Sequence, residues 1–131
     1  MCLLDEVIEW HGGHLRCRAT THRALDNPLR AHGRLGIACG IEYAGQAMAL
    51  HSAAAHLGSG APRMGFLASV RDLRPFVLRL DDIESDLVCD VTHLMGDART
   101  AQYEFALSAL HKTLLSGRAM VVLDAGRRST L

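Results

Sequence analysis

Glu42 is the only formally charged residue between positions 35 and 62, a stretch made otherwise of apolar, small and neutral polar residues. Gln46 follows one helical turn later, so the two side chains would share one face of a helix. His22 and His32 lie in the segment just before this stretch. Carboxyl and imidazole groups are the side chains most used for proton transfer, and burial on an apolar helix would raise the pKa of the carboxyl group. The pattern indicates acid–base catalysis, with a structural carboxylate tied to a loop or an arginine as the alternative.

The element that carries Glu42 is predicted to be a long helix over residues 35–57. This stretch contains no proline, and alanine, leucine and methionine, which are good helix formers, predominate. Apolar or small residues occupy nearly every angular position, so the helix should be covered on most sides. Gly58-Ser59-Gly60 follows and favours the end of the helix there.

The other segments predict an antiparallel sheet. Residues 2–9 and 14–20 are predicted to form a hairpin, because the two glycines of HGGH favour a tight turn between them. The second run alternates apolar and charged residues, which is the pattern of a half-buried strand. A long loop follows at 21–34, and Pro75 predicts a bend or a sheet edge. Further strands are expected at 64–80, 87–94, 101–110 and 114–123, with a frayed tail at 125–131. A single helix that is apolar all round needs a sheet curled around it, which predicts an α+β hot-dog fold over residues 1–131 as one domain.

The composition excludes several classes of function. A formal net charge of +0 and a pI near 7.1 give no basic surface for nucleic acid or anionic membrane. No signal sequence opens the chain and the 35–57 stretch contains polar residues, so a cytoplasmic protein without a membrane span is expected. The four cysteines are scattered, which favours reduced thiols. His11 and His14 flank the turn, but no third ligand stands near them in the sequence, so neither a metal nor a cofactor is expected.

Three segments carry a resemblance to a known family. GIEYAGQA at 40–47 resembles the helix motif of the β-hydroxyacyl-[acyl-carrier-protein] dehydratases, in which an acidic residue precedes Ala-x-x-Gln. LLDEV at 3–7 resembles that family's first strand, and FLASVR at 66–71 resembles its strand after the helix. The match is most similar to the dehydratase-like proteins of aryl polyene and related polyketide or fatty-acid gene clusters.

The resemblance implies removal of water from a 3-hydroxyacyl thioester carried by acyl carrier protein, which gives a trans-2-enoyl thioester. In that family the helix carboxylate, here Glu42, handles the leaving hydroxyl, and a histidine removes the proton beside the carbonyl. Backbone N–H groups from Gly36 to Gly40 would polarise the thioester carbonyl. Gln46 would orient the loop or Glu42.

The loop before the helix departs from the family pattern. The family's histidine lies about fourteen residues before the helix acid, where this chain has Pro28 preceded by Asn27. His32 is therefore the candidate base and His22 the second candidate. The run Asp-Asn-Pro-Leu at 26–29 with His32 also resembles the motif of the MaoC-like enoyl hydratases, but its spacing differs by one residue at both ends.

The open edges of the expected sheet favour a dimer with a continuous sheet, either a homodimer or a heterodimer with a related subunit. The resemblance implies that acid and base come from different protomers, so His32 of one chain would approach Glu42 of the other. A mostly apolar tunnel beside Glu42 would hold the acyl chain. Its expected lining and substrate-binding residues are Gly36, Gly40, Ile41, Met64, Phe66 and Leu67, and the expected carrier-docking residues are Arg30, Arg34 and Arg63.

Two other functions stay open on the sequence alone. A chain without a working base would be an acyl-binding module, or a catalytically weak partner subunit of an active dehydratase. A hot-dog acyl thioesterase is the other enzyme class, because a helix glutamate can activate water there.

Overall fold

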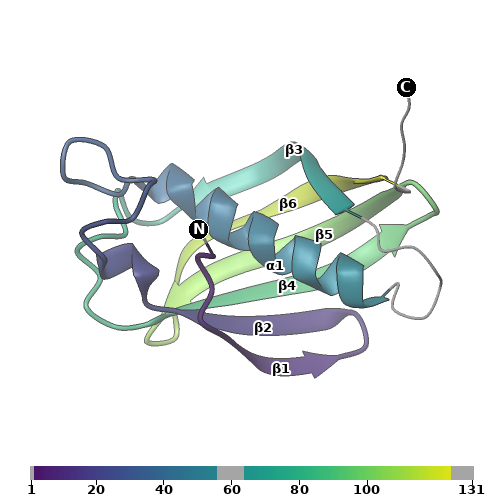
Figure 1. Cartoon of the computed structure of the whole chain (residues 1–131), viewed down its shortest axis with the longest axis horizontal. Coiled ribbons are helices and arrows are strands. Elements are labelled where there is room, and N and C mark those ends of the chain that lie inside the picture. The colour runs from purple at the N-terminus through teal and green to yellow at the C-terminus, as the bar shows by residue number, and fades with distance from the viewer. Residues whose placement is uncertain (1, 56–63, 125–131) are drawn as a thin grey trace.

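The computed structural model describes residues 2–55 and 64–124 (Figure 1). The described elements, in chain order, are β1 (Glu6–His11), β2 (His14–Ala19), a 3₁₀ turn (Thr21–Arg23), a second 3₁₀ turn (Ile37–Cys39), α1 (Gly40–Ala55), β3 (Met64–Pro75), β4 (Leu87–Gly96), β5 (Thr100–Ala109) and β6 (Lys112–Asp124).

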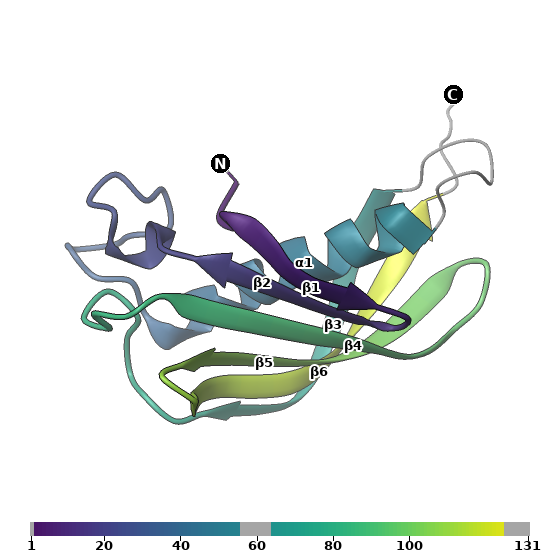
Figure 2. The same cartoon turned by 90° about the horizontal axis from the view of Figure 1, so that it is seen from below.

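The six strands form one antiparallel sheet in the order β1-β2-β4-β5-β6-β3. α1 lies across one face of this sheet, and the sheet curves around the helix (Figure 2). The predicted hot-dog arrangement is therefore confirmed. The last strand of the chain lies inside the sheet, between β5 and β3, so β1 and β3 are the two edge strands.

Alternation along the strands builds the core between the sheet and α1. Along β2, Leu15, Cys17 and Ala19 are buried while the residues between them are only partly buried. Side chains of successive strand residues point to opposite faces, so one face of each strand supplies the core. The largest fully buried side chains are Leu15, His22, Leu35, Tyr43, Met48, Leu80, Leu87, Val91, Tyr103, Phe105, Leu107 and Leu115.

The helix begins later than the sequence predicts. Leu35 and Gly36 are extended, and α1 starts at Gly40 after a 3₁₀ turn. The Leu35 N–H donates to Asp81 Oδ1 at 2.9 Å, and the Leu80 N–H donates to the Leu35 carbonyl at 2.7 Å. These contacts with the β3–β4 connection satisfy backbone groups that a helix would otherwise use, and they override local helix propensity. Residues 56–57 and Gly58-Ser59-Gly60 lie outside the described residues, as does the tail at 125–131.

Gly40 allows α1 to start in close contact with the sheet. A Cβ at this position would lie 2.8 Å from Leu115 Cδ2 and 2.9 Å from Leu107 Cδ2. Both contacts are shorter than ordinary van der Waals separation, so a larger residue here would require the side chains of Leu115 and Leu107 to shift. The close approach fixes the place of Glu42, two residues further along the first turn.

The first strand is also displaced from its predicted range of 2–9. β1 begins at Glu6 and continues to His11, and its hairpin with β2 is confirmed by the pairing of His11 with His14. Residues 2–5 are not in a strand. β3 ends at Pro75 and is an edge strand, as the proline predicts.

Candidate acid–base site at the start of α1

Glu42 lies in the first turn of α1 with its side chain exposed, not buried as the sequence predicts. No described residue forms a hydrogen bond or an ion pair with its carboxylate. The prediction of burial assumed a helix covered on most sides, whereas the sheet covers only one side of α1. Among the described residues, Glu42 and Leu50 are exposed and Gln46 is partly exposed, so an open face runs along the helix through these three positions.

Gln46 fastens the first residues of the chain to this open face. The Leu3 N–H donates to Gln46 Oε1 at 2.7 Å. The sequence predicts that Gln46 orients a loop or Glu42, and the segment that it holds is the one before β1. Thr21 strengthens the same attachment, because its hydroxyl donates to the Leu3 carbonyl at 2.7 Å.

A mainly apolar groove of about 630 Å³ lies between α1 and the first residues of the chain. Cys2, Leu4, Asp5, Glu6, Val7, Cys17, Gln46, Ala49 and Leu50 line it. Gln46, Ala49 and Leu50 stand four, seven and eight positions after Glu42, which places them along the same side of the helix. The groove therefore begins one helical turn beyond the exposed carboxylate.

His22 is not available as a base. Its side chain is fully buried, and Nε2 lies 2.9 Å from the Ile83 carbonyl and 3.1 Å from the Ser85 carbonyl, so this nitrogen donates. Burial lowers the pKa of His22 and keeps the ring neutral. Nδ1 has no hydrogen-bond partner among the described residues. His22 joins the loop to the segment before β4.

Asn27, which precedes the position of the family's histidine, is also structural. It is buried, and its Nδ2 donates to the Thr21 carbonyl at 2.9 Å and to the Tyr43 hydroxyl oxygen at 3.2 Å. Its Oδ1 accepts the Leu29 N–H at 2.9 Å. Burial raises the pKa of Tyr43, so its hydroxyl stays protonated. This network packs the loop onto α1 where the resembled family holds its base.

His32 lies at the tip of a tight turn and is exposed. His32 and Gly33 have φ values of 55° and 75°, and Ala31 and Arg34 exchange backbone hydrogen bonds of 2.9 and 3.0 Å across them. The turn therefore projects the imidazole from the loop surface and not toward Glu42 through a hydrogen bond within this chain. The role of His32 as a base toward Glu42 of a second subunit stays a prediction.

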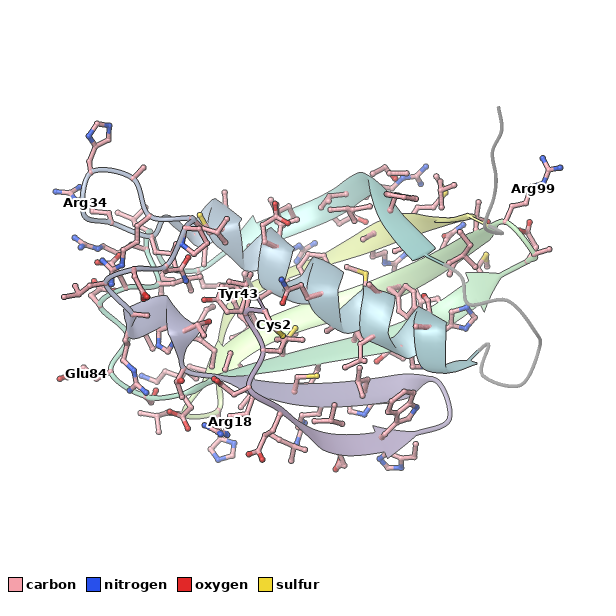
Figure 3. The ribbon with its side chains drawn as sticks, in the orientation of Figure 1. Cys2, Arg18, Arg34, Tyr43, Glu84 and Arg99 are labelled. Atoms are coloured by element: carbon pink, nitrogen blue, oxygen red, sulfur yellow. The ribbon has the colours of Figure 1, made fainter. Side chains whose placement is uncertain are left out.

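The expected carrier-docking arginines differ in their surroundings. Arg30 donates from Nε to the Ala24 carbonyl at 2.8 Å and from Nη1 to the Gly33 carbonyl at 2.9 Å, so it holds the loop together. Arg34 is exposed and extends away from the body of the molecule at the loop end (Figure 3). Arg63 lies outside the described residues.

Several of the backbone donors expected near the start of α1 are occupied. The Ile37 N–H donates to the Leu78 carbonyl at 3.0 Å and the Cys39 N–H to the Gly36 carbonyl at 3.0 Å. The Gly40 N–H donates to the Ala38 and Ile37 carbonyls. An oxyanion site in this chain would therefore have to use other N–H groups of this segment.

The expected substrate-binding residues fall into two groups. Gly36 is exposed, Gly40 is buried and Ile41 packs partly against the core. Phe66 and Leu67 lie on the edge strand β3 with exposed fractions of 51% and 39%. The side chain of Met64 lies outside the described part, although its backbone pairs with β6.

A second polar cluster, which sequence reasoning missed, lies at the other end of α1. His51 Nδ1 and Ser52 Oγ each lie 2.8 Å from the Tyr103 hydroxyl, and all three residues are buried. Burial lowers the pKa of His51 and raises the pKa of Tyr103. His51 and Tyr103 are far apart in sequence, so only the packing of α1 on β5 brings them together.

Comparison with known proteins decides the family. The family model described as ApeP-like, ApeP dehydratase, matches residues 1–128. This chain belongs to the ApeP-like dehydratase family. The resemblance stated from the sequence is thereby confirmed.

Solved structures share the fold. The dehydratase heterocomplex ApeI:P from Xenorhabdus doucetiae matches with a TM-score of 0.81 and 24% identity, over 93% of this chain and 82% of that chain. A mutant thioesterase from Staphylococcus aureus matches with a TM-score of 0.67 and 11% identity, over 91% and 92%. A thioesterase from Haemophilus influenzae matches with a TM-score of 0.67 and 9% identity, over 91% and 77%. The comparison with curated proteins gives no significant match.

Within residues 2–55 and 64–124, no helix combines the length and the hydropathy that a membrane span requires.

Proposed function

We propose that this protein is a subunit of an acyl-thioester dehydratase, acts on 3-hydroxyacyl groups attached to acyl carrier protein, and shares its active site with a second hot-dog subunit. The observation that carries the proposal is the open face of α1. This face presents the exposed carboxylate of Glu42 at one end and, from Gln46 to Leu50, an apolar groove. Family membership supplies the reaction class.

The groove suits the tail of an acyl substrate. It is open and mainly apolar, and Leu4, Val7 and Leu50 are among the residues that line it. Binding sites for acyl groups need such apolar walls with few polar groups that fix the reacting end. The thioester and its hydroxyl would lie at Glu42 and the tail would extend along α1, a different path from the tunnel beside Phe66 that the sequence suggests.

The chemistry requires an acid and a base at adjacent carbons. A base takes the proton from the carbon beside the thioester carbonyl, and the carbon–carbon double bond forms from that electron pair. The carbon–oxygen bond breaks, and the hydroxyl leaves as water with the proton of Glu42. The buried His22 and Asn27 do not offer the base. A histidine of a second subunit would supply it, and His32 of this chain would serve the partner's acid.

The edge strand β3 supports a shared site. It pairs only with β6, and its exposed face carries apolar side chains, with Phe66 51% exposed and Leu73 40% exposed. An unpaired apolar edge is the kind of surface on which another sheet adds. The matched dehydratase from Xenorhabdus doucetiae is a heterocomplex, which favours a related but different subunit as the partner.

The deciding assay compares three samples with 3-hydroxyacyl carrier-protein thioesters: this chain alone, the partner subunit alone and the two purified together. Mass spectrometry of the acyl group measures loss of water, and a thiol reagent measures hydrolysis. The proposal expects water loss that is fastest in the complex. Thiol release would establish a thioesterase, and retention of substrate without turnover by the complex would establish an acyl-binding module.

A wider side chain in the groove tests the acyl path separately. Leu50→Trp should slow turnover of long-chain substrates and spare short ones, because Leu50 lines the groove beyond Gln46. Leu25→Trp is the matched control, since Leu25 is 89% exposed in the loop and does not line the groove. Equal chain-length profiles in the two variants would place the acyl tail elsewhere.

A further inference from the structure

A second group of chemically active side chains lies on the hairpin of β1 and β2, away from Glu42. Trp10 and Leu15 are register partners, and Trp10 contacts His51 of α1 with ring centroids 5.9 Å apart. Neighbouring strand residues point to the opposite face. His11 and His14, the next register pair, therefore face away from α1, on the outer side of the sheet.

Glu9 completes a set of three metal-binding side chains with this histidine pair. One carboxylate oxygen of Glu9 and one ring nitrogen each of His11 and His14 all lie within 4.8 Å of one another. His11 Nε2 is 3.5 Å from Glu9 Oε1, and the two imidazole rings lie 5.9 Å apart at 63°. Glu9 is two residues before His11 on β1, so strand alternation puts both on the same face.

The neighbouring strand holds His14 in place. His14 Nε2 lies 2.8 Å from Asp90 Oδ1 on β4, and Arg16 Nε donates to the same oxygen at 2.7 Å. With Nε2 donating to the carboxylate, the tautomer leaves Nδ1 of His14 with its lone pair. A carboxylate behind a histidine is the usual arrangement around bound metal, because it orients the ring and makes the ligand nitrogen more basic.

We propose that Glu9, His11 and His14 bind a divalent transition-metal ion, Zn²⁺ by preference, with Asp90 as the supporting carboxylate. Imidazole with carboxylate suits Zn²⁺, and three protein ligands leave a fourth position for water. Bonds of about 2.0–2.1 Å place tetrahedral ligand atoms roughly 3.3 Å apart. The side chains of Glu9 and His11, which are 44% and 71% exposed, close the remaining distance by rotation.

The charges of the hairpin agree with a cation at this point. Two carboxylates, Glu9 and Asp90, lie near the two histidines, and Arg16 is the one guanidinium that contacts Asp90. A doubly charged ion would add attraction to both carboxylates. The ion would tie β1 to β2 beside their turn. Its binding would therefore stabilise the β1 edge of the sheet.

The test uses the full chain without an affinity tag, stripped of metal with a chelator. Titration calorimetry with Zn²⁺ should give one ion per chain, and Zn²⁺ should raise Tm. Asp90→Asn should weaken binding about tenfold, as loss of a supporting carboxylate does. His14→Gln should weaken it further. His11→Gln provides a second ligand variant, because that side chain is largely exposed and should not affect folding.

The matched control is His111→Asn. His111 is exposed at the turn before β6 with φ 65°, a conformation that asparagine tolerates, and it should leave Zn²⁺ affinity unchanged. Absence of Zn²⁺ binding by the unaltered chain would overturn the proposal, as would Zn²⁺ affinity in the His11→Gln and His14→Gln variants equal to that of the unaltered chain. With Co²⁺, a sulfur-to-metal charge-transfer band would assign the ion to cysteines and reject the hairpin site.

Discussion

The two ends of α1 treat their polar side chains in opposite ways. At the start, Glu42 is exposed and contacts no described hydrogen-bonding or charged partner. At the other end, His51 and Ser52 are buried and share the hydroxyl of Tyr103. Polar groups that satisfy one another inside a fold stabilise that fold, whereas an exposed acid in the first turn of a helix contributes only a small favourable interaction with the helix dipole. From this comparison we expect chemistry at the first end and structure at the second.

Substitution at Glu42 should have the largest effect on activity. Glu42→Gln keeps the size of the side chain but removes its titrating proton, so the dehydration rate of the assembled complex should fall by roughly 10²–10⁴. Tm of the chain should change little, because the exposed side chain loses only its small interaction with the helix dipole. Steady-state kinetics of the complex and thermal unfolding of the chain measure the two quantities. Full activity in this variant would move the acid to the other subunit.

Substitution at Tyr103 should give the opposite result. Tyr103→Phe removes the hydroxyl that lies 2.8 Å from both His51 Nδ1 and Ser52 Oγ. The loss of a buried hydrogen-bonding group costs about 1–3 kcal/mol of unfolding free energy. Chemical denaturation should detect this loss while kcat of the complex stays near that of the parent. A large loss of kcat with unchanged stability would contradict the assignment of this end to structure.

Acidification should act on the buried end as well, with a smaller effect. Burial lowers the folded-state pKa of His51 below the value near 6.5 at which unfolded histidine titrates. The unfolded state therefore binds more protons as the pH falls, so stability is complete above about 6.5 and decreases below it, toward the lower folded pKa. The Gly12 carbonyl raises the pKa of His51 through a hydrogen bond, and the charges of the neighbouring His93 and of His14 on the outer face of the sheet lower it. Denaturation at pH 7.5 and 5.5 measures the decrease.

Replacement of His51 separates the contributions of the two buried histidines, His51 and His22, to the pH dependence of stability. His22 is buried with a lowered pKa and acts with the same sign. His51→Gln should therefore reduce the pH dependence of the unfolding free energy without abolishing it. An unchanged pH dependence in this variant would assign the whole effect to His22 and other groups.

The smallest expected effect is at the loop near the start of α1. Arg34 is exposed and makes no side-chain ion pair with a described residue, so Arg34→Glu should leave stability unchanged. Reversal of a charge at the rim of an interface alters association with an acidic carrier protein. KM should rise a few-fold for carrier-linked substrates and not for small thioesters. Equal increases for both substrates would indicate damage to the loop instead of lost docking.

Local patterns predicted most of the sheet, because alternation and turn residues act over a few positions. The hairpin at Gly12 and Gly13 and the edge position of β3 are examples, although β3 ends at Pro75 and not at residue 80 as predicted. The start of α1 was predicted wrongly, because Asp81 and Leu80 hold Leu35 extended from a distant part of the chain. Propensity alone contains no information about such contacts.

In the candidate site, too, local features could be predicted and features that depend on distant contacts could not. The position of Glu42 on the helix was predicted from its isolation in an apolar stretch, but its exposure depended on how far the sheet reaches around α1. The sequence shows His11 and His14 as a pair at a turn, but the prediction of no metal site rested on the lack of a third ligand. Glu9 is near them in sequence, yet Asp90 of β4 joins them only when the sheet forms.

β3 has a consequence for how the protein is supplied to its partner. The register of β3 shifts between Leu67 and Ser69 and again between Arg71 and Arg74, where Asp72 has a positive φ of 52°. The irregular backbone near Asp72 disfavours pairing with arbitrary strands, while the exposed apolar end at Phe66 remains open to association. A cell that translates this chain in excess of the proposed second subunit would accumulate copies in which the Phe66 end of β3 stays uncovered. Matched synthesis of the two subunits, through shared transcription or paired translation, would keep that surplus small.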